Sequence, residues 1–334
     1  MSGVPVIRLK SYNYLFLLMN LSVIPMAMAQ RAATPAYPMR PVRLIVPFAP
    51  GGGNDTLTRS VAAHLSTNLG QSFVVDNRSG AGGVVGGEIV AKATPDGHTL
   101  LMGSSSLAVN ASLIKNMPHD AVKDFSPVGL VGATTYMLAV HPAVAIKTVP
   151  ELITLAKARP NQLNYSSGGI GSPLHLAAEL FRSMTAVQLT HLPYKGGVPA
   201  VAAVIAGEAQ VIFSSITTTL PAVKGNRVRA VAVTGAKRSA LMPELPTVAE
   251  SGVPGYESTN WYGVLAPART PASIIDLLNS ELKKILSAPE FRERMTTGQG
   301  IEPMLSTPAE FATYLKGEVE KWARVIKQAG IRPD

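Results

Sequence analysis

Two glycine-rich segments of this sequence could hold an anion. The first runs from Pro47 to Asp55 and contains three consecutive glycines, and the second runs from Ser166 to Ser172. Glycine leaves backbone N–H groups uncovered, and a helix that starts after such a segment adds partial positive charge, so both segments suit a small anion. The alternative for either segment alone is a tight turn between a strand and a helix. One segment in each half of the chain favours a clamp that grips a carboxylate from two sides.

The residues that we expect to bind the ligand come from these segments and from the ends of nearby predicted strands. Hydroxyl, amide and imidazole groups would add hydrogen bonds to those of the backbone, and a lysine could pair with the carboxylate. We predict a site made of Phe48, Ala49, Gly51, Gly52, Asn54, Asp55, Ser104, Ser166, Ser167, Gly168, Gly169, Ser172, His175, Lys195 and Ser214.

Two of these residues also have simpler interpretations. Lys195 could be an exposed lysine in a turn, and His175 could pack in the first turn of a helix instead of donating to the ligand. His175 and Glu179 are four residues apart, a spacing that can place two metal ligands on one helix face. No second His, Asp or Glu cluster of ligand spacing accompanies them, so we predict neither a metal nor any other cofactor.

The motifs of nucleotide binding and catalysis fit poorly. The run from Gly51 to Thr56 lacks the third glycine of the dinucleotide fingerprint, and no Lys-Ser or Lys-Thr follows it as in a phosphate loop. The chain has no G-x-S-x-G element and no cysteine, which excludes a nucleophile elbow and thiol chemistry. Hydroxyl groups without paired carboxylates suit binding better than acid–base catalysis. We therefore predict a binding protein without catalytic residues, with a secreted α/β enzyme acting on a carboxylate as the alternative.

The N-terminal region has the pattern of an export signal. Basic residues precede an apolar run from Tyr14 to Ile24, and small residues follow it up to Ala29. The apolar run is shorter than the roughly 20 residues that cross a bilayer, and a lipid anchor would need a cysteine. We predict a signal peptide over residues 1–29 and a monomer that diffuses freely in the periplasm. An uncleaved anchor or a disordered leader is the alternative.

The charge of the chain is moderately positive. The formal net charge is +9, but the Lys and Arg residues are scattered and form no basic stripe with interleaved aromatic residues. Such a stripe is the footprint of nucleic-acid binding, which we therefore exclude. A positive field instead raises the encounter rate with small anions.

The elements that would position these residues alternate between strands and helices, the pattern of an α/β fold with mostly parallel sheets. The predicted strands are Val42–Val46, Phe73–Val75, Thr99–Met102, Thr135–Val140, Leu163–Ser166, Thr190–Leu192, Gln210–Phe213, Arg229–Thr234 and Tyr262–Ala266. The predicted helices are Asp55–Asn68, Val149–Arg159, Pro173–Met184, Pro199–Ala206, Pro271–Ser287, Pro289–Thr297 and Pro308–Gln328.

Nine strands suit two sheets better than one. Helices and no further strand are predicted after Tyr262–Ala266, so we expect the chain to return there to the first lobe. We predict a discontinuous first lobe of residues 37–137 plus 259–334 and a second lobe of residues 138–258. Strand crossovers between the lobes would act as hinges.

Five motifs occur along the chain from about Tyr37 to the C-terminus. They are Pro47–Gly52, Asn77–Gly83, Pro95–Leu100, Pro193–Gly197 and Pro246–Gly255. In this order they closely resemble the Bug family, the substrate-binding receptors of tripartite tricarboxylate transporters, also called the TctC family.

The resemblance implies a two-lobed periplasmic receptor of the Venus flytrap type. Its cleft would hold a small organic carboxylate between the loops Phe48–Asp55 and Ser166–Ser172, often through ordered waters. Family members deliver the ligand to a membrane permease or, in some cases, to a sensor kinase, so a sensory adaptor without transport is a further alternative. Relatives commonly carry an acidic residue at Ser214 and an asparagine at Val84. Because the acid could pair with a ligand ammonium group, we expect a carboxylate without an amine, such as a di- or tricarboxylate or an aromatic acid.

Overall fold

The computed structural model describes residues 1–5, 37–48, 50–194 and 196–331. From Tyr37 onward the chain forms one compact unit. The predicted signal peptide and its cleavage site lie outside the described residues, apart from residues 1–5. No helix in the described part of the chain is long and apolar enough to cross a membrane.

Strands and helices alternate along most of the chain, as predicted. The strands are β1 (Val42–Val46), β2 (Phe73–Asn77), β3 (Thr99–Ser104), β4 (Phe125–Val140), β5 (Asn164–Ser167), β6 (Thr190–Pro193), β7 (Val211–Ser215), β8 (Arg229–Val233), β9 (Thr259–Pro267) and β10 (Glu302–Pro303). The helices are α1 (Gly53–Leu69), α2 (Val84–Ala91), α3 (Ser105–Leu113), α4 (Val149–Ala158), α5 (Pro173–Thr185), α6 (Gly197–Ile205), α7 (Ile216–Lys224), α8 (Ala272–Ser287), α9 (Pro289–Glu293) and α10 (Pro308–Gln328). A short 3-10 turn covers Ala81–Gly83, and a π-helical turn covers Arg294–Gln299.

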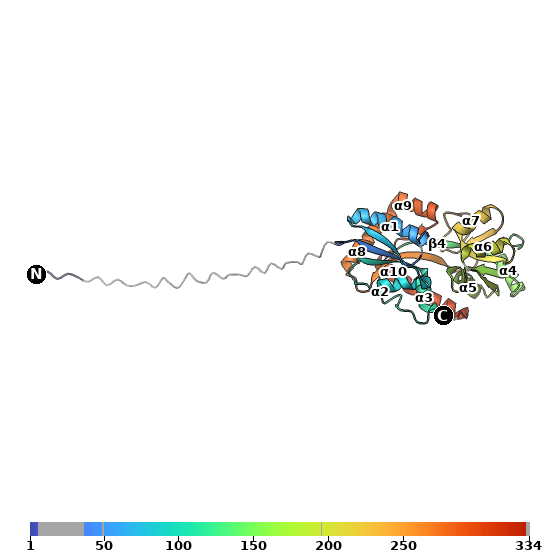
Figure 1. The fold of residues 1–334 in the computed structure, drawn as a ribbon, viewed down its shortest axis with the longest axis horizontal. Coiled ribbons are helices and arrows are strands. Elements are labelled where there is room, and N and C mark those ends of the chain that lie inside the picture. The colour runs from blue at the N-terminus through green and yellow to red at the C-terminus, as the bar shows by residue number, and fades with distance from the viewer. Residues whose placement is uncertain (6–36, 49, 195, 332–334) are drawn as a thin grey trace. The chain divides into compact units, whose positions relative to one another are not determined.

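The expectation of two sheets was wrong, because the strands form one continuous sheet. Its order is β2-β1-β3-β9-β4-β7-β5-β6, with β8 and β10 also paired to β4. Three strands at one end (β2, β1, β3) are parallel, and so are three at the other (β7, β5, β6). The long strands β9 and β4 run antiparallel to each other between them. Figure 1 shows α1, α2 and α8 at one end of β4 and α4 to α7 at the other. This arrangement has the predicted two-lobed α/β architecture, with two halves that share β4.

The strand β4 is the main link between the halves. Its first part pairs with β9, and Tyr136–Val140 pairs with β7 and β8. The return of the chain through β9 supports a first lobe assembled from both ends of the sequence. The boundaries 37–137 plus 259–334 and 138–258 remain a prediction.

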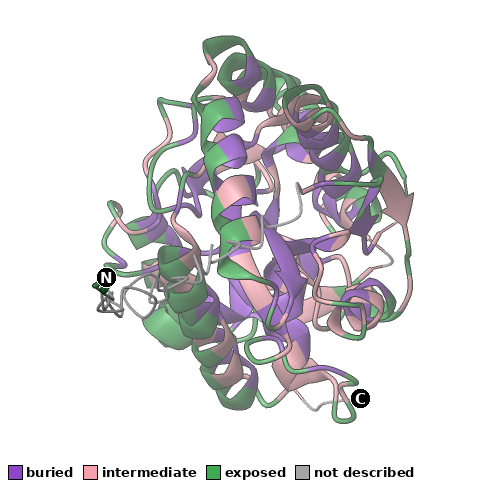
Figure 2. Cartoon of the chain, turned by 90° about the vertical axis from the view of Figure 1, so that its left-hand side faces the viewer, coloured by how far each residue is buried: buried purple, intermediate pink, exposed green. Residues whose placement is uncertain are grey.

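The first half is built around the buried strand β1. Its sequence Val-Arg-Leu-Ile-Val is apolar at four of five positions, as expected for a strand covered on both faces. Neighbouring side chains point to opposite faces: Leu44 belongs to the same buried cluster as Leu57 of α1 and Ile275 of α8, whereas Ile45 belongs to a second cluster with Val90 of α2. Figure 2 shows the buried strands inside and the exposed outer faces of the helices.

Three helices were absent from the predicted elements, namely α2, α3 and α7. In α2 the glycines Gly86 and Gly87 resemble a loop, but they allow close packing. A Cβ at Gly86 would lie 2.7 Å from Cβ of Pro47, and one at Gly87 would lie 2.6 Å from the ring of His119. Glycine here reflects the approach of neighbouring groups, which the local pattern does not show.

Two strand predictions were wrong in extent or number. We expected a strand over Thr135–Val140, but β4 begins ten residues earlier, at Phe125. Gly129 and Gly132 interrupt the apolar pattern there because helices and β10 press against the strand; a Cβ at Gly132 would lie 2.6 Å from Ile301. The prediction that no strand follows Tyr262–Ala266 was also wrong, since β10 pairs with β4.

Candidate functional site

A cavity of about 860 Å³ lies between the two glycine-rich segments. Gly52 and Gly53 of the first segment line it, and so do Gly171 and Ser172 of the second. Its lining consists of Phe48, Gly52, Gly53, Asn54, Ala81, Gly82, Ser104, Ser105, Ser106, Val109, Asn110, Leu113, Ile114, Ile170, Gly171, Ser172, Pro173, Asn260, Tyr262 and Ile331. Both segments therefore open into one crevice, as a clamp requires.

Of the helices that begin at this cavity, two have N-termini without a side-chain cap. The N-cap of α1 is Gly52 and that of α3 is Ser104, and neither makes a side-chain capping hydrogen bond. The first N–H groups of a helix have no partner within the helix, and the aligned peptide dipoles add partial positive charge there. The two N-termini thus make one end of the cavity favourable for an anion.

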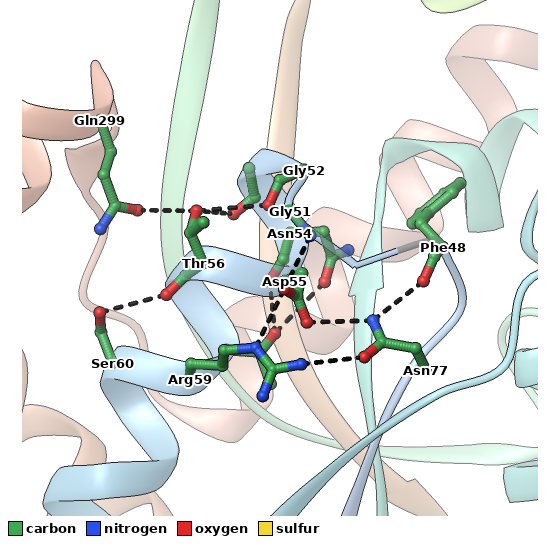
Figure 3. Close-up of polar contacts among 12 residues, drawn as sticks. Phe48, Gly51, Gly52, Asn54, Asp55, Thr56, Arg59, Ser60, Asn77 and Gln299 are labelled. Carbon is green, nitrogen blue, oxygen red and sulfur yellow. Dashed lines mark hydrogen bonds and ion pairs between the residues drawn. The ribbon is translucent and has the colours of Figure 1, made fainter.

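Asp55 shapes the first segment from within (Figure 3). Its carboxylate accepts hydrogen bonds from the Gly51 amide at 2.9 Å, from Nε of Arg59 at 3.0 Å and from Nδ2 of Asn77 at 3.0 Å. Asn77 also donates to the carbonyl of Phe48 at 3.0 Å. Burial alone would raise the pKa of Asp55, but these hydrogen bonds outweigh it and hold the pKa below its ordinary value. Asp55 therefore fixes the loop and does not line the cavity.

Neutral polar side chains stand beside the N-terminus of α1. The hydroxyl of Ser105 donates to Oδ1 of Asn260 at 2.6 Å, and Nδ2 of Asn260 donates to the hydroxyl oxygen of Tyr262 at 2.9 Å. A Cβ at Gly53 would lie only 3.2 Å from that hydroxyl. Burial raises the pKa of Tyr262, so the phenol stays protonated at neutral pH and can donate to a ligand.

Sequence reasoning missed Asn260 and Tyr262 as site residues. They lie two positions apart on β9, so both side chains point to the same face. That alternation of polar residues within an apolar strand was the available signal.

The hydroxyls of the second segment hold the protein itself together. Oγ of Ser166 donates to the carbonyl of Ala200 at 2.9 Å, and Oγ of Ser167 lies 2.7 Å from Nε2 of His191. Both serines are fully buried. This placement does not support the predicted contact of Ser166 and Ser167 with the ligand.

His175 positions the second segment. The Gly171 amide donates to its Nδ1 at 3.0 Å, and its own amide donates to Oγ of Ser172, the N-cap of α5, at 3.2 Å. The ring stacks on His191 with centroids 4.1 Å apart. Burial lowers the pKa of both histidines, that of His191 to about 4, and Arg182 adds to the effect. Both rings are therefore neutral at neutral pH, and His175 accepts from the loop where we expected a donor to the ligand.

His175 and Glu179, the two residues with metal-ligand spacing, have another role. Nε2 of His175 lies 3.8 Å from Glu179, but the Glu179 carboxylate accepts hydrogen bonds from Tyr165 and Arg182. This buried cluster ties α5 to β5. Within the described residues, no group of three or more His, Asp or Glu side chains could hold a metal ion.

The structure brings only some of the predicted site residues to the cavity. Those that line it are Phe48, Gly52, Asn54, Ser104 and Ser172. Those that do not are Gly51, Asp55, Ser166, Ser167, Gly168, Gly169, His175 and Ser214. Ser214 is fully buried at the end of β7, and its hydroxyl has no partner among the described residues. Ala49 and Lys195 lie outside the described residues, and the ligand contacts of the predicted residues remain a prediction.

Comparisons with known proteins agree on one family. The family model described as the tripartite tricarboxylate transporter family receptor matches residues 57–331. Protein BugT of Bordetella pertussis is 36% identical, over 89% of this chain and 91% of that protein. A solved structure of an R. palustris protein with adipate is 36% identical with a TM-score of 0.74, covering 89% of this chain and 100% of that chain. MatC from Rhodopseudomonas palustris with bound malate is 30% identical with a TM-score of 0.69, covering 87% of this chain and 100% of that chain.

Proposed function

The chain belongs to the tripartite tricarboxylate transporter receptor family, and we propose that it is a periplasmic receptor that captures a small organic carboxylate between its two lobes. The family predicted from the sequence motifs is confirmed. Family and structural relatives are substrate-binding receptors, not enzymes.

The observation that carries the proposal is the shared cavity. The uncapped N-termini of α1 and α3 open into it beside the neutral polar side chains of Ser105 and Tyr262. Backbone N–H groups at a helix N-terminus bind carboxylates well because their partial charge is fixed in place. Two relatives with the same fold were solved with the carboxylates adipate and malate, which supports the same ligand class here.

Capture works if the ligand contacts both halves of the chain. Gly52 and Gly53 belong to the first half, and Gly171 and Ser172 to the second. A ligand that touches both sets is bound more tightly in the closed arrangement than in an open one, and only such a difference in affinity can shift the equilibrium. Closure around the shared strand β4 would then signal that the receptor is loaded.

The loaded receptor would deliver its ligand to the membrane permease of a tripartite transporter. Delivery to a sensor kinase is the second candidate within the same family. We further propose that residues 1–29 are an export signal removed after Ala29 and that the mature protein is a monomer without a cofactor. Uptake of a labelled ligand by cells with and without the receptor gene separates transport from sensing.

The carboxylate site is tested with a substitution that fills it. In Gly52→Leu the backbone is not strained, because Gly52 has φ −78° and ψ 169°. The new side chain is expected to fill the space in front of the α1 N-terminus, where the carboxylate would bind. At a ligand concentration of about 100 Kd the wild type should gain about 2.7 kcal/mol. With an unfolding entropy of about 0.6 kcal/mol/K for a chain of this length, Tm should rise by about 4 °C. The variant should lose this shift.

The control is Gly317→Leu on α10, where a Cβ meets no atom within 4 Å. It should keep the ligand-dependent shift. Absence of any stabilisation of folded wild-type protein across a library of organic acids refutes the carboxylate receptor. Turnover of a bound acid by the purified protein would favour the enzyme alternative.

A further inference from the structure

The wall of the cavity formed by α3 indicates how long the ligand is. Ile114, the C-cap residue, extends the wall beyond the helix, and within α3 the wall consists of Ser106, Val109, Asn110 and Leu113. These positions recur at spacings of three and four, so they form one face of the helix. With a rise of 1.5 Å per residue, the face runs for about 10.5 Å from Ser106 to Leu113. The cavity therefore extends along the helix and is not confined to its N-terminus.

Polarity changes along this wall. At its start, Ser105 is hydrogen-bonded to Asn260 beside the N-terminus of α1. At its end, Leu113 and Ile114 line the cavity together with Ile170 and Ile331. One end of the cavity is thus polar, with oriented N–H groups, and the other end is mainly apolar, with Ser172 as the polar residue beside Ile170 and Gly171.

The apolar end lies where the two halves of the protein meet. A Cβ at Gly171 would lie 2.8 Å from Cδ1 of Leu113, so the end of α3 is in contact with the second glycine-rich segment. Ile170, the residue before Gly171, is 72% exposed although it lines the cavity. An exposed apolar side chain in a concave site marks a surface that a ligand covers.

We propose, building on the carboxylate receptor above, that the ligand is an elongated acid with a single carboxylate. The carboxylate binds at the N-termini of α1 and α3. An apolar body lies along α3 and ends against Leu113, Ile114 and Ile170. A second carboxylate at this end would face Leu113, Ile114 and Ile170. The nearby Gly171 amide and Ser172 hydroxyl oxygen are already hydrogen-bonded to His175, so the carboxylate's loss of hydration would be unfavourable. The site therefore selects acids by the length and apolarity of the body.

Calorimetric titration with straight-chain acids tests the apolar body. Affinity should rise from butanoate to hexanoate to octanoate by about fourfold for each methylene that is buried. This factor corresponds to about 0.8 kcal/mol of binding free energy per methylene, because about 1.4 kcal/mol changes an affinity tenfold. Octanoate should bind more tightly than suberate, the dicarboxylate with the same number of carbons. Malate and adipate serve as short and medium dicarboxylate probes.

Ile170→Ser removes part of the apolar end without touching the core. It should weaken octanoate binding by about tenfold, the effect of losing most of one buried aliphatic side chain. It should weaken butanoate binding much less, because the shorter chain ends before Ile170. Val198→Ser is the matched control, because Val198 is 71% exposed in the same half but does not line the cavity. Melting curves of both variants show that they are folded.

The outcomes separate the two proposals. If malate or adipate binds but affinity does not rise with chain length, or suberate equals octanoate, the apolar-body inference is overturned and the carboxylate receptor stands. An equal loss of octanoate binding in Ile170→Ser and Val198→Ser also overturns it. If none of these acids binds to folded wild-type protein, both proposals fail.

Discussion

Replacing Asp55 by asparagine tests how the first glycine-rich segment keeps its shape. The carboxylate accepts from the Gly51 amide, Arg59 and Asn77. An amide of the same size has one acceptor oxygen, and its NH₂ group must then face one of these donors. The substitution therefore breaks at least one hydrogen bond and leaves a buried donor unpaired.

The expected cost follows from the partners. A hydrogen bond to a buried charged group contributes about 1.5–3 kcal/mol. The Arg59 side chain is 54% exposed, so its ion pair adds little. We expect a loss of about 2 kcal/mol. With an unfolding entropy of about 0.6 kcal/mol/K for this chain, Tm should fall by about 3 °C at pH 7.

The pH dependence identifies the carboxylate as the cause. Because the pKa of Asp55 is lowered in the folded protein, its contribution is complete above the unfolded pKa of about 3.9 and is lost as pH falls towards the folded pKa. The asparagine variant has no such group. The difference in Tm between wild type and variant should therefore shrink below about pH 4.

Circular dichroism melting curves between pH 7 and pH 3 measure both effects. The control is Asp276→Asn, an exposed aspartate on α8, which should change Tm by less than about 1 °C. A Tm difference for Asp55→Asn that is absent at pH 7, or that stays constant down to pH 3, would show that the Asp55 hydrogen bonds do not stabilise this segment.

Two further predictions concern other parts of the fold. The pKa of His191 falls to about 4 on folding, so between about pH 6.5 and 4 the unfolded chain takes up a proton that folded His191 does not. Stability should therefore decline as pH falls through this range, and His191→Phe should reduce the decline. If Tm falls equally steeply with pH in wild type and variant, the lowered pKa of His191 is contradicted. Gly263→Ala should destabilise by about 1–3 kcal/mol through overpacking, since its Cβ would lie 2.7 Å from Cε1 of Phe311. Gly317→Ala on the exposed face of α10 should instead stabilise slightly, and chemical denaturation that ranks the two alike would refute the packing argument.

Much of the local structure follows from the sequence pattern. The strand Val42–Val46 and the helix Pro308–Gln328 have the predicted bounds, because a run that is apolar at four of five positions and a Thr-Pro start with a capping glutamate are strong local signals. The helix after the first glycine-rich segment was predicted from its apolar spacing, as Asp55–Asn68 where the structure has Gly53–Leu69. The Ser-Pro start of α5, with Ser172 as its cap, is a local capping signal.

The cavity wall could not be predicted in this way. The helix α3 begins with serines and has no clear apolar period, and its Ser105 pairs with Asn260, 155 residues later in the chain. Likewise, Ser166 and Ser167 follow a glycine-rich pattern that suits ligand contact, yet their hydroxyls bond to Ala200 and His191. Which partner a polar side chain finds depends on elements that are distant in the sequence.

The sequence by itself therefore determined the order and type of most elements, the position of the glycine-rich segments and the family. The spacing of apolar residues, helix capping and the backbone conformation of glycine each depend on a few neighbouring residues, so they can be recognised from the local sequence. Only the tertiary structure decided which groups line the cavity and which stabilise its walls. That division depends on the pairing of β4 with both halves and on the packing of α3 between the two segments, contacts that exist only once the chain has folded.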